Sequence, residues 1–390
     1  MAKRVLVTGG AGLIGSHLTD LLLREGHSVR ILDNLEPQTH LTQAYPAGKP
    51  EWVSQEAEFL HGDMRSEADL KKTLKNIDWV FHQAAFGGFT TALTQYMDVN
   101  ATGTARLFEI IRQEKLPVEK IVAASSQAIY GEGLYHCKTH GDIVPEMRSR
   151  EQLLKRQWES RCPECLKSGI DSELRPVLTP ENSAMNGETI YAVSKLAEEK
   201  LTLGLGKLLG IPTVALRYAV TYGPRQSIFN PYTGVVSIFS TRLLNDKAPV
   251  IYEDGKQTRD FLFVEDNARA NLFVMEHADT AYQVYNVGTG QPLQILDLVS
   301  TLAKIYDKPV SAELPGSFRP GDVRHFVHNP KKLQSLGWKP TVSLQQGISQ
   351  YVDWIATQQN IKDYFEQAQE KLQQLQVVVP AVKAVSGSSV

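Results

Sequence analysis

The segment VLVTGGAGLIG, residues 5–15, decides the fold. Three apolar residues lead into a turn whose glycines, Gly9, Gly12 and Gly15, have a G-x-x-G-x-x-G spacing. Glycines permit a tight turn and let the backbone approach a pyrophosphate, and the following helix offers free N–H groups and a positive dipole end. An ordinary glycine-rich turn could look the same, but this one follows a predicted strand and opens an amphipathic helix. The pattern therefore predicts dinucleotide binding by Gly9, Gly12, Leu13, Ile14 and Gly15.

Short apolar runs alternate with helical patterns through the first half of the chain. Strands are predicted at Val5–Val7, Val29–Leu32, Trp79–Phe81, Ile121–Ala124 and Val214–Leu216. Helices are predicted over 13–22, 68–74 and 101–111. This repetition predicts an α/β, Rossmann-type doubly wound parallel sheet with helices on both faces. Such sheets bind ligands beyond the carboxyl ends of their strands, so chemistry is expected just after each apolar run.

Asp33 ends the second predicted strand, 18 residues after Gly15. A carboxylate there can accept hydrogen bonds from both ribose hydroxyls and repels a 2′-phosphate, and no arginine stands beside it. NAD is therefore favoured over NADP as the cofactor. Other strand-end residues are expected to meet the cofactor too, namely Asn34, Asp63, Met64, Gln83, Ala84 and Ala85.

Composition excludes several classes of protein. The 390 residues carry 41 Lys plus Arg and 43 Asp plus Glu, a net charge of −2, without the basic excess of a general nucleic-acid binder. Three cysteines exclude a disulfide scaffold. The N-terminal apolar run is too short for a signal peptide, and no stretch approaches a membrane span. We therefore expect a cytoplasmic protein without nucleic-acid or membrane partners.

Tyr191 and Lys195 form a Y-x-x-x-K pattern before a helical stretch. At positions i and i+4 they share a helix face, and the nearby ammonium lowers the tyrosine pKa from its usual value of about 10. That makes Tyr191 a general base usable near neutral pH. An isolated pair of this kind is more often a surface contact. Here Ser125 and Ser126 follow a parallel strand and can lie beside the cofactor, although serine can also simply cap a turn.

Together these motifs resemble the extended short-chain dehydrogenase/reductase family, the NAD-dependent sugar-nucleotide epimerases and dehydratases. The resemblance covers about residues 3–358. The matching motifs are TGGAGLIGSHL at 8–18, DNL at 33–35, GD at 62–63, VNATGT at 99–104, SSQAIYG at 125–131, YAVSK at 191–195, RYAVTYGPRQ at 217–226, DGKQTRDF at 254–261, NVG at 286–288, RPGD at 319–322 and LGWKP at 336–340.

The resemblance implies a role for each matching residue. Tyr191 would be the base, Lys195 its pKa partner and nicotinamide-ribose ligand, and Ser126 the third catalytic residue. Asn100, Ser125 and Tyr218 would join the residues that line NAD. A nucleoside diphosphate sugar would lie between two lobes, and an arginine fork suits its diphosphate, although surface salt bridges are the alternative. The implied substrate-binding residues are Gly87, Ser126, Gln127, Asn230, Tyr252, Arg259, Arg319 and Asp322.

The resemblance also divides the chain. An NAD-binding Rossmann domain is expected over 1–216, with an insertion at 132–189 and a return of the chain at 259–290. Segments 217–258 and 291–358 would form a smaller C-terminal substrate-binding lobe, and 376–390 a mobile tail. Homologues often dimerise through a four-helix bundle, so we expect a homodimer that uses the helices around 100–112 and 194–209.

The residues after Ser126 bear on the reaction. Related 4,6-dehydratases carry Asp-Glu there and decarboxylases a Glu, whereas this chain has Gln127 and Ala128. A 4-epimerase needs only a ketone intermediate that rotates in the site and a hydride that returns to its other face. We therefore predict an NAD-dependent 4-epimerase of a dTDP- or UDP-hexose or 6-deoxyhexose, acting through a transient 4-keto intermediate. The alternatives are a decarboxylase, dehydratase or reductase on the same scaffold, and a non-catalytic dinucleotide sensor, which would not need the base.

Within the family, some features resemble dTDP-L-rhamnose 4-epimerase-like proteins. The shared features are residues 131–135, 230–235 and 321–325 and the insertion before Tyr191. The sequence departs from the pattern at Val220, where the family's diphosphate ligand is Asn, and in the unusual segment 86–91.

Cys162-Pro163-Glu164-Cys165 is half of a zinc-knuckle pattern. Cys137 with His136 or His140 could complete four ligands, but the second C-x-x-C is missing. The prediction is that the chain holds no metal. A structural zinc at Cys137, Cys162 and Cys165 is the alternative.

Overall fold

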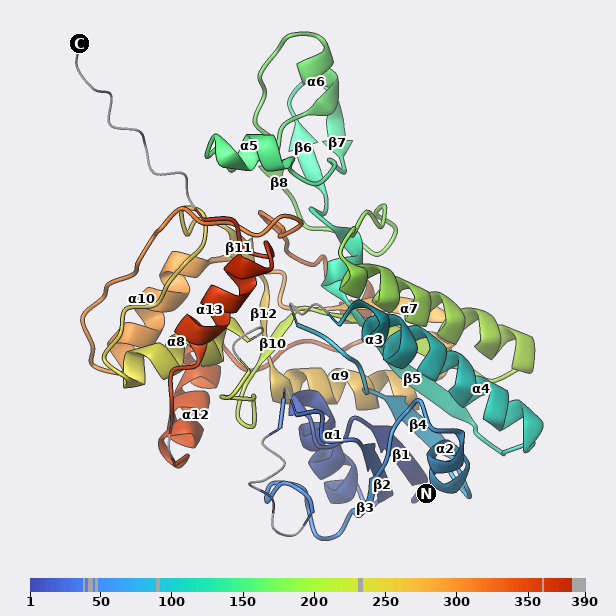
Figure 1. The fold of residues 1–390 in the computed structure, drawn as a ribbon. Helices are drawn as coiled ribbons and strands as arrows, with labels where there is room; N and C mark the ends of the chain where they lie inside the picture. Colours follow the sequence, from blue (N-terminus) through green and yellow to red (C-terminus); the bar gives the residue numbers. More distant parts are fainter. Residues whose placement is uncertain are drawn as a thin grey trace, which may run out of the picture.

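A parallel seven-stranded sheet forms the centre of the protein (Figure 1). The computed structural model describes residues 1–37, 39–40, 45, 48–88, 92–230, 234–359 and 361–380. The strand order is β13–β9–β5–β4–β1–β2–β3, and every neighbouring pair is parallel. The strands are β1 (Arg4–Thr8), β2 (Ser28–Asp33), β3 (Glu58–His61), β4 (Trp79–His82), β5 (Lys120–Ser126), β9 (Thr213–Tyr218) and β13 (Gln283–Val287). The five predicted strands and the Rossmann-type sheet are confirmed, and the order reverses between β1 and β4, where such sheets bind ligands.

Helices cover both faces of the sheet (Figure 1). On one face α1 (Leu13–Arg24) packs against α9 (Val264–Glu276). On the other lie α2 (Glu67–Thr73), α4 (Gly103–Gln113) and α7 (Ile190–Leu209). Because both faces are covered, Val5, Leu6 and Val7 of β1 are fully buried. This explains the continuous apolar runs from which the strands were predicted.

Capping interactions determine where α7 begins and ends. The Thr189 side chain accepts the N–H of Ala192, and Gly210 ends the helix in the left-handed conformation. Tyr191 and Lys195 therefore lie in the first turns of a fixed helix. Before α4, the short α3 (Leu93–Tyr96) runs into a π-helix, η2 (Met97–Thr102).

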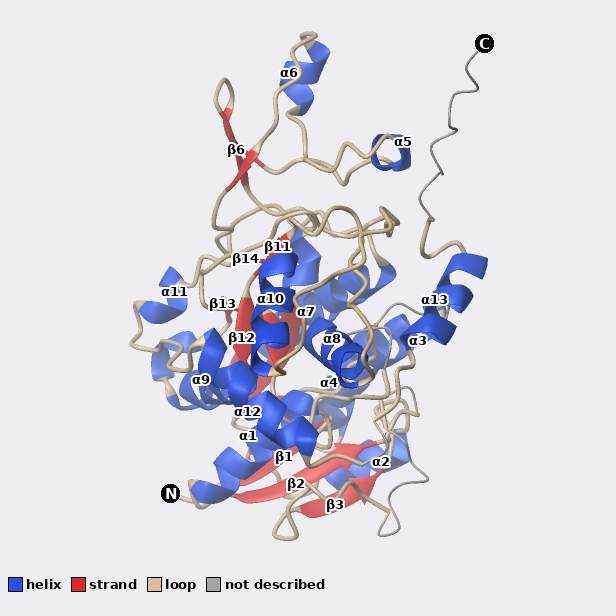
Figure 2. Ribbon diagram, turned by 90° about the vertical axis from the view of Figure 1, so that its left-hand side faces the viewer, coloured by secondary structure: helices blue, strands red, loops and turns tan. Residues whose placement is uncertain are grey.

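The helices and short strands of a second, smaller lobe, drawn as ribbons in Figure 2, enclose a separate hydrophobic core. Tyr222, Phe239, Phe263, Leu298 and Tyr351 are among its buried residues. Its elements are β10 (Val220–Tyr222), α8 (Val235–Leu244), β11 (Thr258–Arg259), β12 (Phe261–Phe263), β14 (Leu293–Gln294), α10 (Ile295–Ile305), α12 (Leu344–Ala356) and α13 (Phe365–Gln374). The short η4 (Ala278–Thr280) and α11 (Lys331–Gln334) lie next to α9 and β13 of the first lobe.

The segment after β5 forms a projection on the body of the molecule (Figure 1). After the 3-10 helix η3 (Gln127–Tyr130), it contains β6 (Tyr135–Cys137), β7 (Gly141–Ile143), α5 (Arg150–Leu154), α6 (Pro163–Lys167) and β8 (Arg175–Pro176). The three strands form an antiparallel sheet in the order β7–β6–β8. What the sequence presented as an insertion or extended loop thus contains three short strands and two short helices, joined by loops.

The start of the predicted tail packs on the body. Val378 and Val379 are buried, and Val379 pairs with Phe318, so the tail prediction does not hold at these positions. Residues 381–390 lie outside the described residues.

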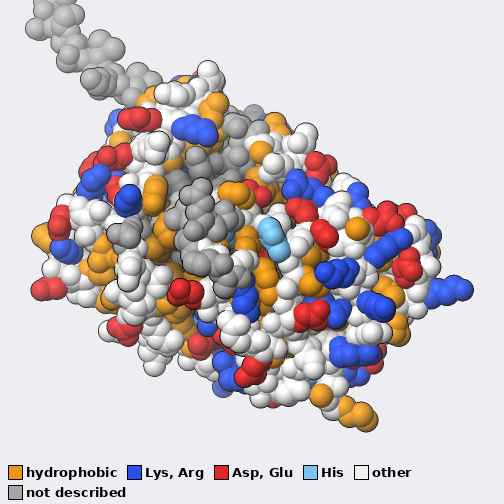
Figure 3. Space-filling model, turned by 60° about the horizontal axis from the view of Figure 1, so that its bottom comes forward, with side chains coloured by type: hydrophobic (Ala, Val, Ile, Leu, Met, Phe, Trp, Pro, Cys, Tyr) orange, Lys and Arg blue, Asp and Glu red, His pale blue; other side chains and the backbone are white. Residues whose placement is uncertain are grey.

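The surface carries charges of both signs. On the face shown in Figure 3, basic and acidic side chains are interspersed. Among the helices that the structure describes, none is long and apolar enough to cross a membrane.

Gly15 tests the packing on which the fold depends. A Cβ built on Gly15 would lie 2.2 Å from the carbonyl oxygen of Gly9 and 2.8 Å from Cα of Gly10, so α1 would have to move. We expect Gly15→Ala to lower the free energy of unfolding by about 1–3 kcal/mol in urea titrations. The control is Gly204→Ala in α7, where a Cβ meets nothing within 4 Å and the change should stabilise by about 0.5–1 kcal/mol. Equal stability of the two variants would contradict this account.

Candidate active site

A cavity of about 790 Å³ lies between the two lobes and collects most of the predicted site residues. Those that line it are Gly9, Gly12, Leu13, Ile14, Gly15, Gln83, Ala85, Gly87, Ser125, Ser126, Gln127, Tyr191, Tyr218, Asn230, Tyr252, Arg259, Arg319 and Asp322. They come from the carboxyl ends of β1, β4 and β5, from α7 and from the smaller lobe. The fold therefore joins a dinucleotide-type turn, a Tyr–Ser pair and an arginine pair in one space.

Other predicted residues are not among those that line the cavity. These are Asp33, Asn34, Asp63, Met64, Ala84, Asn100 and Lys195. Their roles toward a cofactor stay predictions. Two motif segments from the sequence, 89–91 and 231–233, lie outside the described residues.

The glycine turn has the shape and polarity of an anion site. Gly9 has φ +68°, and a Cβ there would lie 2.7 Å from the backbone nitrogen of Ala84, so only glycine fits. Gly12 caps α1 without a side chain, and the first helical turn carries no acidic residue. The N–H groups and positive dipole end of α1 are therefore open to a pyrophosphate. The residues present fit a dinucleotide.

Asp33 holds this turn in place. Its Oδ2 accepts the N–H of Ala11 at 2.9 Å, and its Oδ1 accepts the N–H of Leu35 at 2.9 Å. A carboxylate has about four acceptor sites, so these two bonds leave capacity for ribose hydroxyls. The strand-end carboxylate thus orients the glycine turn, and its role toward a cofactor stays a prediction.

Aromatic residues of the segment after β2 lie over the turn, and sequence reasoning missed them. Trp52 donates its indole N–H to the carbonyl of Ala11 at 3.0 Å. His40 stacks on Trp52 with ring centroids 6.3 Å apart, and Tyr45 packs against both rings. All three line the cavity. The available clue was two aromatic residues in a segment that leaves the carboxyl end of a strand.

Asp63 is held in a local ion pair. Arg65 lies 2.7 Å from its Oδ2, and Asn34 donates to the same oxygen at 2.9 Å. Although burial raises the pKa of Asp63, these bonds from Arg65 and Asn34 outweigh it and hold the pKa at about 2. The carboxyl is therefore ionised at neutral pH.

Asn100, in the π-helix, fixes the backbone beside the cavity. Its Oδ1 accepts the N–H of Phe86 at 2.7 Å, and its Nδ2 donates to the carbonyl of Phe86 and to Oγ of Ser194, both at 2.9 Å. The side chain is fully buried. It therefore ties the segment after β4 to α7, and the wide turn of η2 is a feature that recurs at functional sites.

Lys195 is buried behind Tyr191 and forms an ion pair that the sequence did not predict. Its Nζ lies 2.5 Å from Oε2 of Glu198, one turn further along α7, and both side chains are buried. Burial raises the pKa of Glu198 to about 7, against the opposing effect of Lys195. The clue in the sequence was the pair Glu198-Glu199, just one turn after the lysine.

His82 stands on the other side of Glu198, with its Nε2 4.0 Å from Oε1. Burial, and then the charge of Lys195, lowers the pKa of His82 to about 3, so the ring is neutral. Its two nitrogens meet the hydroxyls of Thr8 and Thr104 at 2.8 and 2.9 Å. The positive charge near Tyr191 is therefore that of Lys195, partly offset by Glu198.

The two serines after β5 have different surroundings. Ser126 Oγ accepts the N–H of Ala128 at 3.1 Å, so it caps η3 and also lines the cavity. Ser125 donates to Oε2 of Glu199 at 2.7 Å, and Glu199 pairs with Arg217 at 2.6 Å. Ser126 thus caps a turn, as the alternative interpretation expected, and it also lies in the cavity, while its catalytic role stays a prediction.

Tyr191 is one of the tyrosines that line the cavity. It lies in the cavity beside Gly87, where a built Cβ would be 3.4 Å from the Tyr191 ring, and beside Tyr96. Burial raises the pKa of Tyr218 and of Tyr130, so both stay protonated. Tyr218 also donates to Oε1 of Gln83 at 3.0 Å, which holds both predicted cofactor residues together.

The predicted substrate residues of the smaller lobe meet one another. Arg259 Nη2 lies 3.1 Å from Oδ1 of Asp322, and the Arg319 guanidinium sits 4.7 Å above the ring of Tyr252. All four line the cavity, so this is not merely a surface salt bridge. Two arginines facing a shared space suit a diphosphate.

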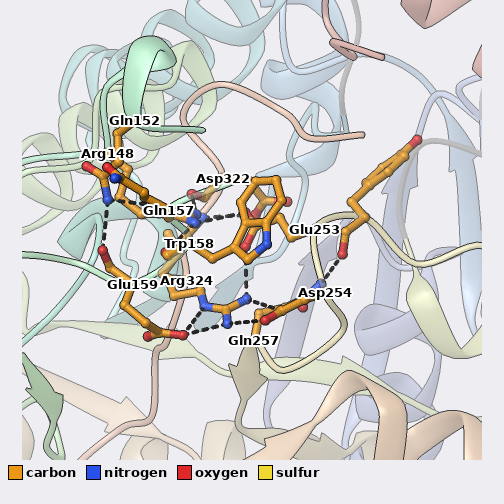
Figure 4. A network of polar contacts seen from close by, with 12 residues as sticks. Arg148, Gln152, Gln157, Trp158, Glu159, Glu253, Asp254, Gln257, Asp322 and Arg324 are labelled. Carbon is orange, nitrogen blue, oxygen red and sulfur yellow. Dashed lines mark hydrogen bonds and ion pairs between the residues drawn. The ribbon is translucent and has the colours of Figure 1, made fainter. Parts of the chain in front are cut away.

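A buried charge network supports these residues from behind (Figure 4). Arg324, fully buried, pairs with Glu159, Glu253 and Asp254 at 2.6–3.0 Å. Arg148 pairs with Glu132 and Glu253, each at 2.9 Å, and donates to the carbonyl of Asp322 at 2.8 Å. Sequence reasoning missed this network, because its members are scattered from position 132 to 324.

The chain is similar to a known family of enzymes. The chain matches the NAD dependent epimerase/dehydratase family over residues 5–146 and 172–288. A dTDP-L-rhamnose 4-epimerase of Burkholderia thailandensis is 34% identical, over 93% of this chain and 97% of the relative. A putative UDP-glucose 4-epimerase of Methanocaldococcus jannaschii is 32% identical, over 90% and 98%.

Solved structures agree with these matches. A UDP-glucose 4-epimerase of Thermotoga maritima with UDP-glucose has a TM-score of 0.72 and 29% identity, over 90% of this chain and 98% of that one. A UDP-glucuronic acid 4-epimerase of Bacillus cereus, in complex with UDP-glucuronic acid and NAD, has a TM-score of 0.71 and 27% identity, over 90% and 99%.

Glu198 should make stability depend on pH. Its pKa is about 7 in the fold and about 4.5 when unfolded, so the folded chain keeps this proton longer. The stabilising effect is complete below about pH 4.5 and is lost as pH rises toward 7. Between these pH values we expect the unfolding free energy of Glu198→Gln to fall by about 1–3 kcal/mol less than that of wild type. Urea unfolding across that range measures the difference.

The control is Glu188→Gln, since Glu188 is exposed just before α7 and should leave the wild-type pH dependence intact. Parallel stability curves for Glu198→Gln and wild type would contradict the raised pKa.

Proposed function

The chain belongs to the NAD dependent epimerase/dehydratase family, and from that premise we propose that it is an NAD-dependent nucleotide-sugar 4-epimerase. One observation carries the proposal. Tyr191 and Ser126 line the same cavity as the glycine turn and the residues Arg259 and Arg319. A base, a cofactor site and a diphosphate site are thus in reach of one molecule.

NAD would be held by the glycine turn and α1, with Asp33 as the ribose ligand. When bound, NAD accepts a hydride from a sugar carbon and returns it. The openness of the α1 N-terminus and the lack of room for a Cβ at Gly9 support this assignment. Gln83 and Tyr218, which hydrogen-bond each other, would contact it from β4 and β9.

Tyr191 would take the proton from the sugar 4-hydroxyl, leaving a 4-keto sugar. Lys195 lies one helical turn further along α7, four residues after Tyr191. Ser126 would hydrogen-bond the same sugar oxygen and orient it toward the base. On the way back, Tyr191 returns the proton to the new hydroxyl, so the chain ends each cycle in its starting state.

The residues next to Ser126 support epimerisation over the other fates of a ketone. Gln127 and Ala128 both line the cavity, and neither can transfer a proton to or from a neighbouring carbon. The 4-keto sugar would therefore rotate in the cavity and be reduced on its other face. The names of the related 4-epimerases support the same reaction.

Arg259, Arg319 and Asp322 would hold the substrate's diphosphate and nucleoside ribose. Arg259 rests against Asp322 in this structure, and a diphosphate can compete for the same guanidinium. The proposed substrates are dTDP- or UDP-linked hexoses and 6-deoxyhexoses, the classes to which the named relatives' substrates belong.

The decisive test is Tyr191→Phe. The variant should lose turnover by at least about a hundredfold, because the base is gone, while NAD stays bound. Wild type and variant would be incubated with a panel of dTDP-, UDP- and GDP-sugars, with NMR of the product and release of NAD on denaturation as readouts. Tyr306→Phe, at the end of α10 in the smaller lobe, is the matched control and should keep full activity. Undiminished epimerisation by Tyr191→Phe would refute the mechanism.

We also propose a homodimer located in the cytoplasm, without nucleic-acid partners. α4 and α7 pack side by side, and α7 leaves Val193 and Leu208 exposed, which supports a helical interface there. Light scattering after gel filtration should give twice the chain mass of 43.4 kDa. A mass of one chain at micromolar concentration would contradict the dimer.

A further inference from the structure

We propose that Cys137, His140, Cys162 and Cys165 bind a structural zinc ion that holds the projecting insertion together. One ligand atom from each residue, three sulfurs and one imidazole nitrogen, lies within 4.8 Å of the other three. Among the described residues, this is the one group of histidine, cysteine or acidic side chains whose ligand atoms lie close enough together to hold a metal ion. The inference does not depend on the proposed function.

The distances between these atoms are those of a tetrahedral site. With Zn–S near 2.3 Å and Zn–N near 2.05 Å, tetrahedral geometry places two sulfurs about 3.8 Å apart and a sulfur and a nitrogen about 3.6 Å apart. The Cys137 and Cys165 sulfurs are 3.6 Å apart. His140 Nδ1 lies 3.6, 3.4 and 3.5 Å from the sulfurs of Cys137, Cys162 and Cys165. These four distances match a tetrahedral site, and the remaining two sulfur–sulfur distances are no longer than 4.8 Å.

The ligands come in two pairs with the same spacing. Cys137 ends β6, and His140 follows three positions later in the turn to β7, a C-x-x-H pair. Cys162 precedes α6 and Cys165 lies within it, a C-x-x-C pair. Two short knuckles that face each other are a common way to build a zinc site.

His136, the other histidine considered from the sequence, points away. Residues 136 and 137 are neighbours on β6, and successive side chains of a strand face opposite sides. His136 Nδ1 instead lies 2.7 Å from Asp142, with its side chain 40% exposed. The site therefore has the composition Cys₃His with His140.

The insertion needs such a link because its own core is small. Besides the three cysteines, the cluster of apolar side chains inside it consists of Tyr135 and Leu174, with Ile143 packed against them. All three cysteines are free and fully buried, and the sulfur separation of 3.6 Å is far from the roughly 2.05 Å of a disulfide. Small domains with little core are commonly held by metals.

The link also bears on the cavity. Arg148 and Glu159 lie between the two ligand pairs in the chain, and Figure 4 shows both joined to the segment that carries Asp322 and Arg324. An ion that orders the insertion would thereby hold Asp322 beside Arg259.

The test is the metal content of the full-length protein. Protein produced with zinc sulfate in the medium and dialysed against metal-free buffer should contain about one zinc per chain by mass spectrometry of the elements. The double variant Cys162→Ser/Cys165→Ser should contain less than a tenth of that, and His136→Ala should keep it. Folded wild type with less than about a tenth of a zinc, or with iron in its place, would overturn the proposal.

Cobalt provides a second measurement that does not need the cysteine variants to fold. Wild-type protein reduced, stripped with a chelator and titrated with Co²⁺ alone should show thiolate-to-cobalt charge-transfer absorption and tetrahedral ligand-field bands at one equivalent. Bound cobalt without thiolate bands would place the metal elsewhere and overturn the assignment.

Discussion

The close approach of backbone to backbone at the glycine turn is the constraint on which the rest of the structure depends. A Cβ on Gly15 would strike the carbonyl of Gly9, and a Cβ on Gly9 would strike the backbone at Ala84. Glycine at both positions lets α1 begin directly above β1 and lets β4 end beside it. The open N-terminus of α1 thereby meets the carboxyl ends of the neighbouring strands, and Tyr191 and Ser126 face the same space.

Buried charges orient this site from behind. Lys195, Glu198 and neutral His82 form one group under Tyr191, and Glu199 with Arg217 forms another under Ser125. Leaving any of these charges without its partner would be costly in a dry interior, so each pair restricts how α7 can sit on the sheet. The same logic applies to Arg324 in the smaller lobe. The cavity is thus lined by few charged groups but surrounded by many that cannot move independently.

Local patterns were sufficient for the central sheet and for the residues at strand ends, because a parallel sheet repeats one rule from strand to strand. They were not sufficient for contacts between segments far apart in the chain. Trp52 over Ala11 depends on how a long segment folds back. Val379 paired with Phe318 shows that a stretch of weak periodicity can still pack, here through an isolated β-bridge to a segment far away in the chain.

The sequence by itself determined the Rossmann-type sheet, the glycine turn, the Tyr191–Lys195 pair and the family, since each follows from residues close together in the chain. The tertiary structure decided which distant groups share a site. It placed Glu198 against Lys195 and His82, and it brought His140 rather than His136 to the three cysteine sulfurs. Helix and strand periods are local properties, whereas the burial of a charge or the assembly of four ligands depends on the packing of the whole chain.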